Sequence, residues 1–64
     1  MERIYEYITR TGVVLERKEG ETVRTLERQL NELAKKGYTV VSLEQIFNPH
    51  DGWRFSLVMK KRVN

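Results

Sequence analysis

The single histidine of the chain, His50, stands beside Asp51 within the turn-rich segment Asn48-Pro49-His50-Asp51-Gly52. A histidine next to a carboxylate can act as a general base when the two side chains face each other. Neighbouring residues in a turn usually point apart into solvent, and the 64-residue chain has no cysteine to serve as a nucleophile. The sequence therefore predicts a protein that is not an enzyme and has no catalytic residue.

The residue types also do not indicate a metal site or a phosphate-binding loop. With one histidine, no cysteine and no carboxylates at ligand spacing, the chain matches none of the common zinc patterns. Its four glycines, at positions 12, 20, 37 and 52, fit neither G-x-x-x-x-G-K nor G-x-G-x-x-G. We expect no bound metal and no cofactor.

Basic residues near aromatic residues are the remaining candidates for binding. Residues 1–32 carry a net charge of −1 and residues 33–64 carry +4. The predicted ligand-binding residues are Arg54, Tyr38, Lys60 and Arg62. With Tyr38 or Trp53 as a stacking surface, they could hold an anionic nucleotide at a boundary between subunits. Exposed Tyr5 and Tyr7 beside the same charges would instead favour weak nucleic-acid binding, which we consider the less favoured alternative. A basic strand end is also a common protection against unwanted edge pairing.

One helix should lie between strands that carry these residues. Residues 3–17 are predicted to be extended, with a bulge or bend at Gly12, and residues 17–21 to form a charged loop. Thr22–Lys36 is the predicted helix, with Thr22 as its N-cap and Gly37 as its left-handed stop. Its apolar residues follow helical spacing: Val23, Leu26, Leu30 and Leu33.

Two further strands are predicted at 38–47 and 53–63, joined by the turn at 48–52. The β-α-β-β order favours an α+β fold in which one helix packs on a three-stranded sheet of order first, third, second, with residues 1–64 forming a single domain. The core is expected to contain the helix stripe and the inward strand residues Val41, Leu43, Phe55 and Leu57.

One short helix can cover only one face of such a sheet. Val40, Ile46 and Val58 should lie on the other face, together with either the Ile4/Ile8 pair or the Tyr5/Tyr7 pair. An apolar patch of that extent is rare on a soluble monomer. We therefore expect a homodimer or higher oligomer. The predicted interface residues are Tyr5, Tyr7, Val40, Ile46 and Val58.

Four short motifs follow one another along most of the chain. They are Tyr5-Glu6-Tyr7, the helix end with Leu30, Leu33 and Gly37-Tyr38, then Val40-Val41-Ser42, and finally Lys60-Lys61-Arg62. Their order resembles a group of small bacterial and phage domains of unknown function with a Tyr-x-Tyr strand, a helix ending in Gly-Trp or Gly-Tyr, and a last strand closing in Lys-Arg. The chain departs from that pattern in having Tyr38, where tryptophan is commoner, and in its long first strand with Gly12.

Small phage proteins of this kind include inhibitors of host systems. The resemblance therefore implies, as the leading function, a phage-encoded inhibitor of a host defence system that acts by sequestering a protein or a ligand. An oligomeric nucleotide sponge is the alternative. No apolar run approaches the roughly 20 residues of a membrane helix, and Met1-Glu2-Arg3 lacks the features of a signal peptide. We expect no membrane association and a cytoplasmic location, in the host cytoplasm if the protein is phage-encoded.

Overall fold

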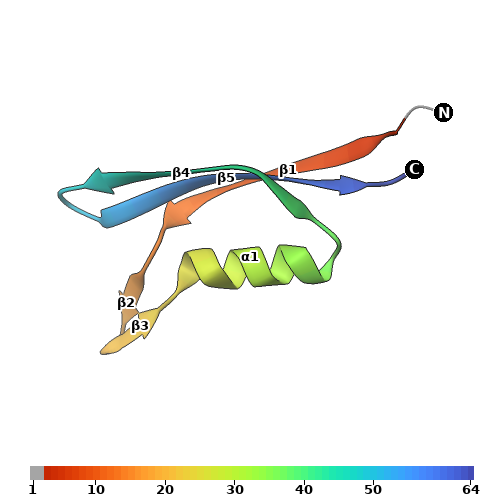
Figure 1. Ribbon diagram of the computed structural model, residues 1–64. Coiled ribbons are helices and arrows are strands. Elements are labelled where there is room, and N and C mark those ends of the chain that lie inside the picture. The colour runs from red at the N-terminus through yellow and green to blue at the C-terminus, as the bar shows by residue number, and fades with distance from the viewer. Residues whose placement is uncertain (1–2) are drawn as a thin grey trace.

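A three-stranded sheet with one helix beneath it forms the body of the molecule, and a short hairpin projects from one end (Figure 1). The computed structural model describes residues 3–64, so Met1 and Glu2 of the N-terminal pattern lie outside it. The elements are β1 (Tyr5–Val13), β2 (Glu16–Lys18), β3 (Glu21–Val23), α1 (Thr25–Lys35), β4 (Thr39–Asn48) and β5 (Gly52–Arg62).

The strands of the main sheet follow the order β1-β5-β4. Both outer strands pair antiparallel to β5, so β1 and β4 run parallel to each other. This arrangement confirms the α+β fold and the strand order expected from the sequence. The backbone extends over 50 × 21 × 10 Å, so the molecule is long and thin.

The turn between β4 and β5 forms where turn residues are concentrated. The side-chain oxygen Oδ1 of Asn48 accepts a hydrogen bond from the backbone N–H of His50 at 2.8 Å. Gly52 has a φ of +83°, a left-handed value that glycine adopts without steric strain. The predicted turn is thereby confirmed, and β4 and β5 are both long enough to reach from one end of the sheet to the other.

The helix begins later than the sequence suggested. Thr22 and Val23 belong to β3, where Val23 pairs with Glu16, so Thr22 is not the N-cap. Arg24 takes the N-cap position without a side-chain hydrogen bond to the helix. The apolar stripe of the helix therefore loses Val23, because this residue pairs with β2 instead of joining the helix.

The end of the helix follows the prediction closely. Gly37 has a φ of +94° and donates its N–H to the Ala34 carbonyl, while Tyr38 donates to the Leu33 carbonyl, both at 3.0 Å. These two bonds form a Schellman motif, which satisfies carbonyl groups left unpaired at the helix end. The motif turns the chain directly into β4.

The first extended segment differs from the expectation in two places. The pairing of β1 with β5 continues without a shift through Gly12, which faces Phe55, and the bend follows at residues 14–15. Gly12 is needed there for space, because a Cβ atom would lie 3.3 Å from Cε1 of the Phe55 ring. The expected charged loop is instead the hairpin β2–β3, turned by Glu19 and Gly20, whose φ values are 51° and 82°.

The core lies between α1 and the underside of β5. Its buried residues are Leu26, Leu33, Phe55, Leu57 and Met59, with Ile8, Val14, Leu30 and Tyr38 packed against them. The expectation for Val41 and Leu43 was wrong: their side chains are 48% and 37% exposed. The helix makes its closest approach to β1, so it leaves β4, on the other side of β5, uncovered. Within the described part of the chain, no helix has the length and apolar character needed to cross a membrane.

Candidate functional site

Pairing partners define which residues share each face of the sheet. Residues directly opposite each other on neighbouring antiparallel strands project to the same side. Ile8 pairs with Met59 and therefore lies on the helix side, whereas Tyr7 pairs with Lys60 on the outer side. This settles the choice between the two sets in β1: the Tyr5/Tyr7 pair occupies the open face.

The outer face carries a cluster of four residues at the end where the termini lie (Figure 1). Tyr5 pairs with Arg62 and Tyr7 with Lys60, and we call these four residues the aromatic–basic cluster. The Lys60 ammonium lies 4.5 Å from the centre of the Tyr5 ring, within cation–π range. The two tyrosine rings lie 6.5 Å apart, and Tyr7 is 61% exposed. The cluster therefore offers positive charge and an accessible ring on one surface.

A second group lies at the same end but on the helix side. Tyr38 donates its hydroxyl proton to Oε1 of Glu6 at 3.1 Å, and the Lys61 ammonium lies 5.7 Å from the Tyr38 ring centre. Partial burial raises the pKa of Tyr38 above 10.0, and the hydrogen bond and negative charge of Glu6 raise the pKa further. Tyr38 is thus tied to its own subunit on the opposite side of the sheet from Lys60.

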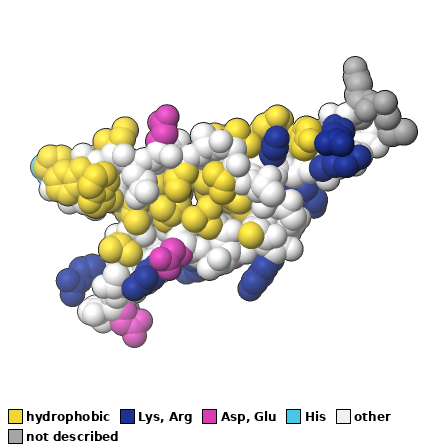
Figure 2. Space-filling view, in the orientation of Figure 1, with side chains coloured by type: hydrophobic (Ala, Val, Ile, Leu, Met, Phe, Trp, Pro, Cys, Tyr) yellow, Lys and Arg dark blue, Asp and Glu magenta, His cyan; other side chains and the backbone are white. Residues whose placement is uncertain are grey.

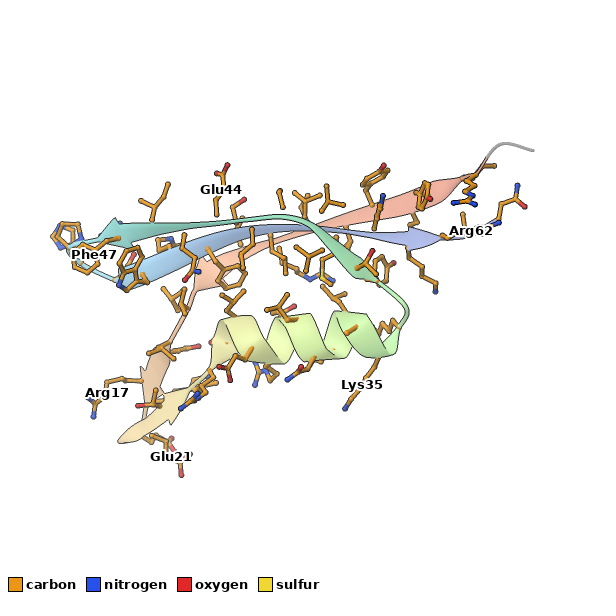
Figure 3. The ribbon with its side chains drawn as sticks, viewed as in Figure 1. Arg17, Glu21, Lys35, Glu44, Phe47 and Arg62 are labelled. Atoms are coloured by element: carbon orange, nitrogen blue, oxygen red, sulfur yellow. The ribbon has the colours of Figure 1, made fainter. Side chains whose placement is uncertain are left out.

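The predicted ligand-binding residues are therefore only partly brought together. Lys60 and Arg62 share the outer face at one end, where Figure 3 labels Arg62. Arg54 lies eight residues from Arg62 along the same strand, roughly 26 Å at strand spacing. Its guanidinium pairs with Asp51 at 3.1 Å. The partners that Lys60 and Arg62 gain are Tyr5 and Tyr7, which the sequence suggested mainly as interface residues. The alternation of Tyr-x-Tyr against Lys-x-Arg is the signal that could have linked them.

The residues predicted to form an interface also divide between the two faces. Val58 and Ile46 lie on the outer face, because they pair with Thr9 and Arg54. Val40 pairs with Met59 of the core and so belongs to the helix side, contrary to the expectation. The cause is a β-bulge between Val40 and Ser42, which changes the alternation of the strand at this point.

An aromatic pair occupies the opposite end of the sheet. Phe47 and Trp53 make an edge-on contact with ring centres 5.6 Å apart, and the two side chains are 58% and 53% exposed. Figure 2 shows hydrophobic side chains gathered at this end. Trp53 continues the apolar alternation of Phe55, Leu57 and Met59, but it is exposed and lies outside the core cluster to which those three residues belong.

Residues 3–64 carry no cluster of metal-ligating side chains, and the depression that they form along α1 is shallow. They contain no group of three or more histidine, cysteine or acidic side chains able to hold a metal ion. A shallow depression of about 480 Å³ runs along α1, and its lining includes the ion pair of Arg24 with Glu27 at 3.3 Å. Arginine, lysine, glutamate, asparagine and valine side chains line it, a mixture without a histidine or cysteine.

Comparison of the chain with protein-family models, with curated proteins and with solved structures found no match.

Proposed function

We propose that this chain is a small non-enzymatic binding protein that works as a homo-oligomer and contacts its partner through the outer face of its sheet. The observation that carries the proposal is the aromatic–basic cluster, in which Lys60 and Arg62 lie beside Tyr5 and the exposed ring of Tyr7. Arginine and tyrosine are enriched in protein interfaces because both combine a large contact area with hydrogen-bonding groups. A surface of this kind suits a partner that presents negative charge and flat apolar groups.

In the leading form of the proposal, the partner is a protein that the chain sequesters. The outer face is uncovered, and it continues from the cluster through Val58 to Ile46, which is 69% exposed. Such a face fits another protein better than a small molecule, which requires a concave site. A phage-encoded inhibitor that occupies a component of a host defence system would act in this way.

A nucleotide sponge is the second candidate, and the contact between Lys60 and Tyr5 favours it. A tyrosine ring can stack on a base while lysine and arginine neutralise phosphate. One subunit provides only a shallow surface for this purpose. Assembly around a symmetry axis would give each oligomer more than one such cluster.

The test compares two double variants that each remove two positive charges. Lys60→Ala/Arg62→Ala removes the cluster charges, and Lys35→Ala/Lys36→Ala removes two exposed charges at the end of α1. Binding is measured by fluorescence anisotropy with labelled nucleotides, a labelled oligonucleotide and a labelled acidic peptide. We expect the cluster variant to weaken binding by about ten-fold or more, the effect of losing roughly 1.4 kcal/mol, and the control to change it little.

Each further outcome bears on the proposal. Equal losses in both variants would mean that only net charge matters, which contradicts a defined site. Loss confined to His50→Ala, or product formed from a bound nucleotide, would overturn the non-catalytic function. Preference for the acidic peptide supports the sequestering form, and preference for a nucleotide supports the sponge.

A further inference from the structure

Strand β4 is an edge strand that is exposed on both faces. It is the last strand in the order β1-β5-β4, so one side of its backbone has no strand partner within residues 3–64. Every residue from Thr39 to Phe47 is exposed, including Val41 and Ile46. Alternate N–H and C=O groups along such an edge are free to pair with another strand.

The segment of β4 that follows the bulge, from Ser42 to Asn48, lacks the usual protection of a free edge. Lysine, proline, inward-pointing charge and β-bulges are common means by which proteins prevent edge pairing. The ten residues Thr39–Asn48 contain neither lysine nor proline, and Glu44 is their single charged residue. The opposite edge strand, β1, carries both Glu6 and Arg10. The less protected edge is therefore the Ser42–Asn48 segment of β4.

The subunit exposes more surface than a compact monomer of its mass does. A compact monomer of 7.7 kDa exposes about 4,300 Å², whereas this subunit exposes 5228 Å². The excess, about 900 Å², is close to the roughly 800 Å² that each partner contributes to a standard stable interface. A second copy of the chain on the uncovered strand would cover part of this excess.

We propose that two copies pair through antiparallel β4 strands, with a two-fold axis through Gln45, to form a six-stranded sheet. This inference rests on the self-association included in the proposed function, and it adds the edge and the register. Because the axis stands perpendicular to the sheet, both helices lie on the same face. The outer faces, with their aromatic–basic clusters, remain open on the other.

The register follows from the bulge and from charge. Between Ser42 and Asn48, β4 pairs with β5 without interruption, and the bulge lies just before this segment. An axis through Gln45 pairs this whole segment with its copy. An axis through Glu44 would set two like charges opposite each other, which is unfavourable, and an axis through Leu43 would carry the pairing into the bulge.

Two pairs of contacts result from this register. On the helix side, Leu43 meets Phe47 of the partner subunit, and these two side chains are 37% and 58% exposed in the single subunit. On the outer face, Ile46 meets Glu44 of the partner subunit. The second contact provides a test that depends on charge sign.

The first experiment replaces Ile46 with residues of opposite charge. Ile46→Glu would place like charges opposite each other at two symmetric positions, and we expect the dimer dissociation constant to rise on the order of ten-fold or more. Ile46→Lys would form two opposite-charge pairs and should retain the dimer. Sedimentation equilibrium reads the result as a mass of 7.7 kDa or twice that value. Circular dichroism establishes that both variants are folded, which we expect because Ile46 is 69% exposed.

The second experiment locates the axis with single cysteines, which the native chain lacks. Gln45→Cys should form a disulfide-linked dimer on mild oxidation, because opposite Cβ atoms lie about 4.5–5.5 Å apart. Leu43→Cys should not, because its two copies would be four residues apart, roughly 13 Å along the strand, beyond the reach of a disulfide.

The outcomes separate this inference from the proposed function. A wild-type protein that remains at 7.7 kDa at high micromolar concentration would overturn self-association altogether. An oligomer that both Ile46 variants dissociate equally, or that neither dissociates, would retain self-association and reject the β4 edge. Cross-linking at Leu43→Cys with none at Gln45→Cys would reject the register.

Discussion

Gly37 shows how a single residue determines where the helix stops and the second long strand starts. Its φ of +94° is a left-handed value, and the nearest atoms to a Cβ atom there would be those of the Lys61 side chain at 3.8 Å, an ordinary contact. The consequence of a substitution is therefore backbone strain alone. We expect Gly37→Val to lower the free energy of unfolding by about 1–2 kcal/mol, measured by urea denaturation at fixed protein concentration.

The neighbouring Lys36→Ala variant serves as its control, because Lys36 is exposed and has a φ of −88°. Its effect should stay within about 0.5 kcal/mol. Equal stability of Gly37→Val and the native protein would contradict the strained conformation.

Tyr38 provides a second test at the residue scale, based on its proton. Its pKa is raised by partial burial and by the hydrogen bond and charge of Glu6. The folded state therefore holds this proton more tightly than the unfolded state does. The resulting stabilisation is fully present below pH 10.0, the ordinary pKa of the group, and is lost as the pH rises through the folded-state pKa.

We expect Glu6→Gln to bring the pKa of Tyr38 closer to its ordinary value. Ultraviolet difference titration measures this pKa, with Tyr38→Phe subtracted to remove the other two tyrosines. An unchanged pKa in Glu6→Gln would show that Glu6 has no part in the shift.

At the scale of elements, the helix packs on the sheet mainly through the buried residues of its apolar stripe. Leu33 is 3% exposed and lies in the core cluster, whereas Leu30 only packs against that cluster. We expect Leu33→Ala to cost about 2–5 kcal/mol, enough to unfold a domain this small. Leu30→Ala should cost clearly less, because less of its surface is buried.

Thermal unfolding followed by circular dichroism compares the two variants, with added sucrose where Leu33→Ala is unfolded in buffer. A larger loss for Leu30→Ala than for Leu33→Ala would mean that the helix is rotated relative to the sheet.

For the whole molecule, assembly should make stability depend on concentration. Anything that binds the folded chain stabilises it by mass action, and a second copy is no exception. We expect the thermal midpoint to rise by several degrees over a hundred-fold increase in protein concentration. Such an increase adds roughly 2–3 kcal/mol to the free energy of unfolding of an assembled chain. Ile46→Glu should show a nearly flat dependence, and a flat dependence in the native protein would contradict assembly.

The sequence by itself determined the elements whose signals are local. The helical spacing of Leu26, Leu30 and Leu33, the stop at Gly37 and the turn at 48–52 all appear in the structure, because each depends on residues a few positions apart. The hairpin β2–β3 was missed because its residues are mostly charged, and only the two left-handed residues Glu19 and Gly20 mark its turn.

Tertiary structure decided which strand the helix covers and which residues share a face. Val41 and Leu43 were expected in the core but are exposed. The single helix α1 is too narrow to cover all three strands, and it lies toward β1. Val40 lies on the helix side because of the bulge between Val40 and Ser42, which the sequence of β4 does not predict. The grouping of Lys60 and Arg62 with Tyr5 and Tyr7 depends on the register between strands that are some fifty residues apart in the chain. The matching alternation of Tyr-x-Tyr and Lys-x-Arg is compatible with this pairing, but the register itself is set by how the whole sheet packs.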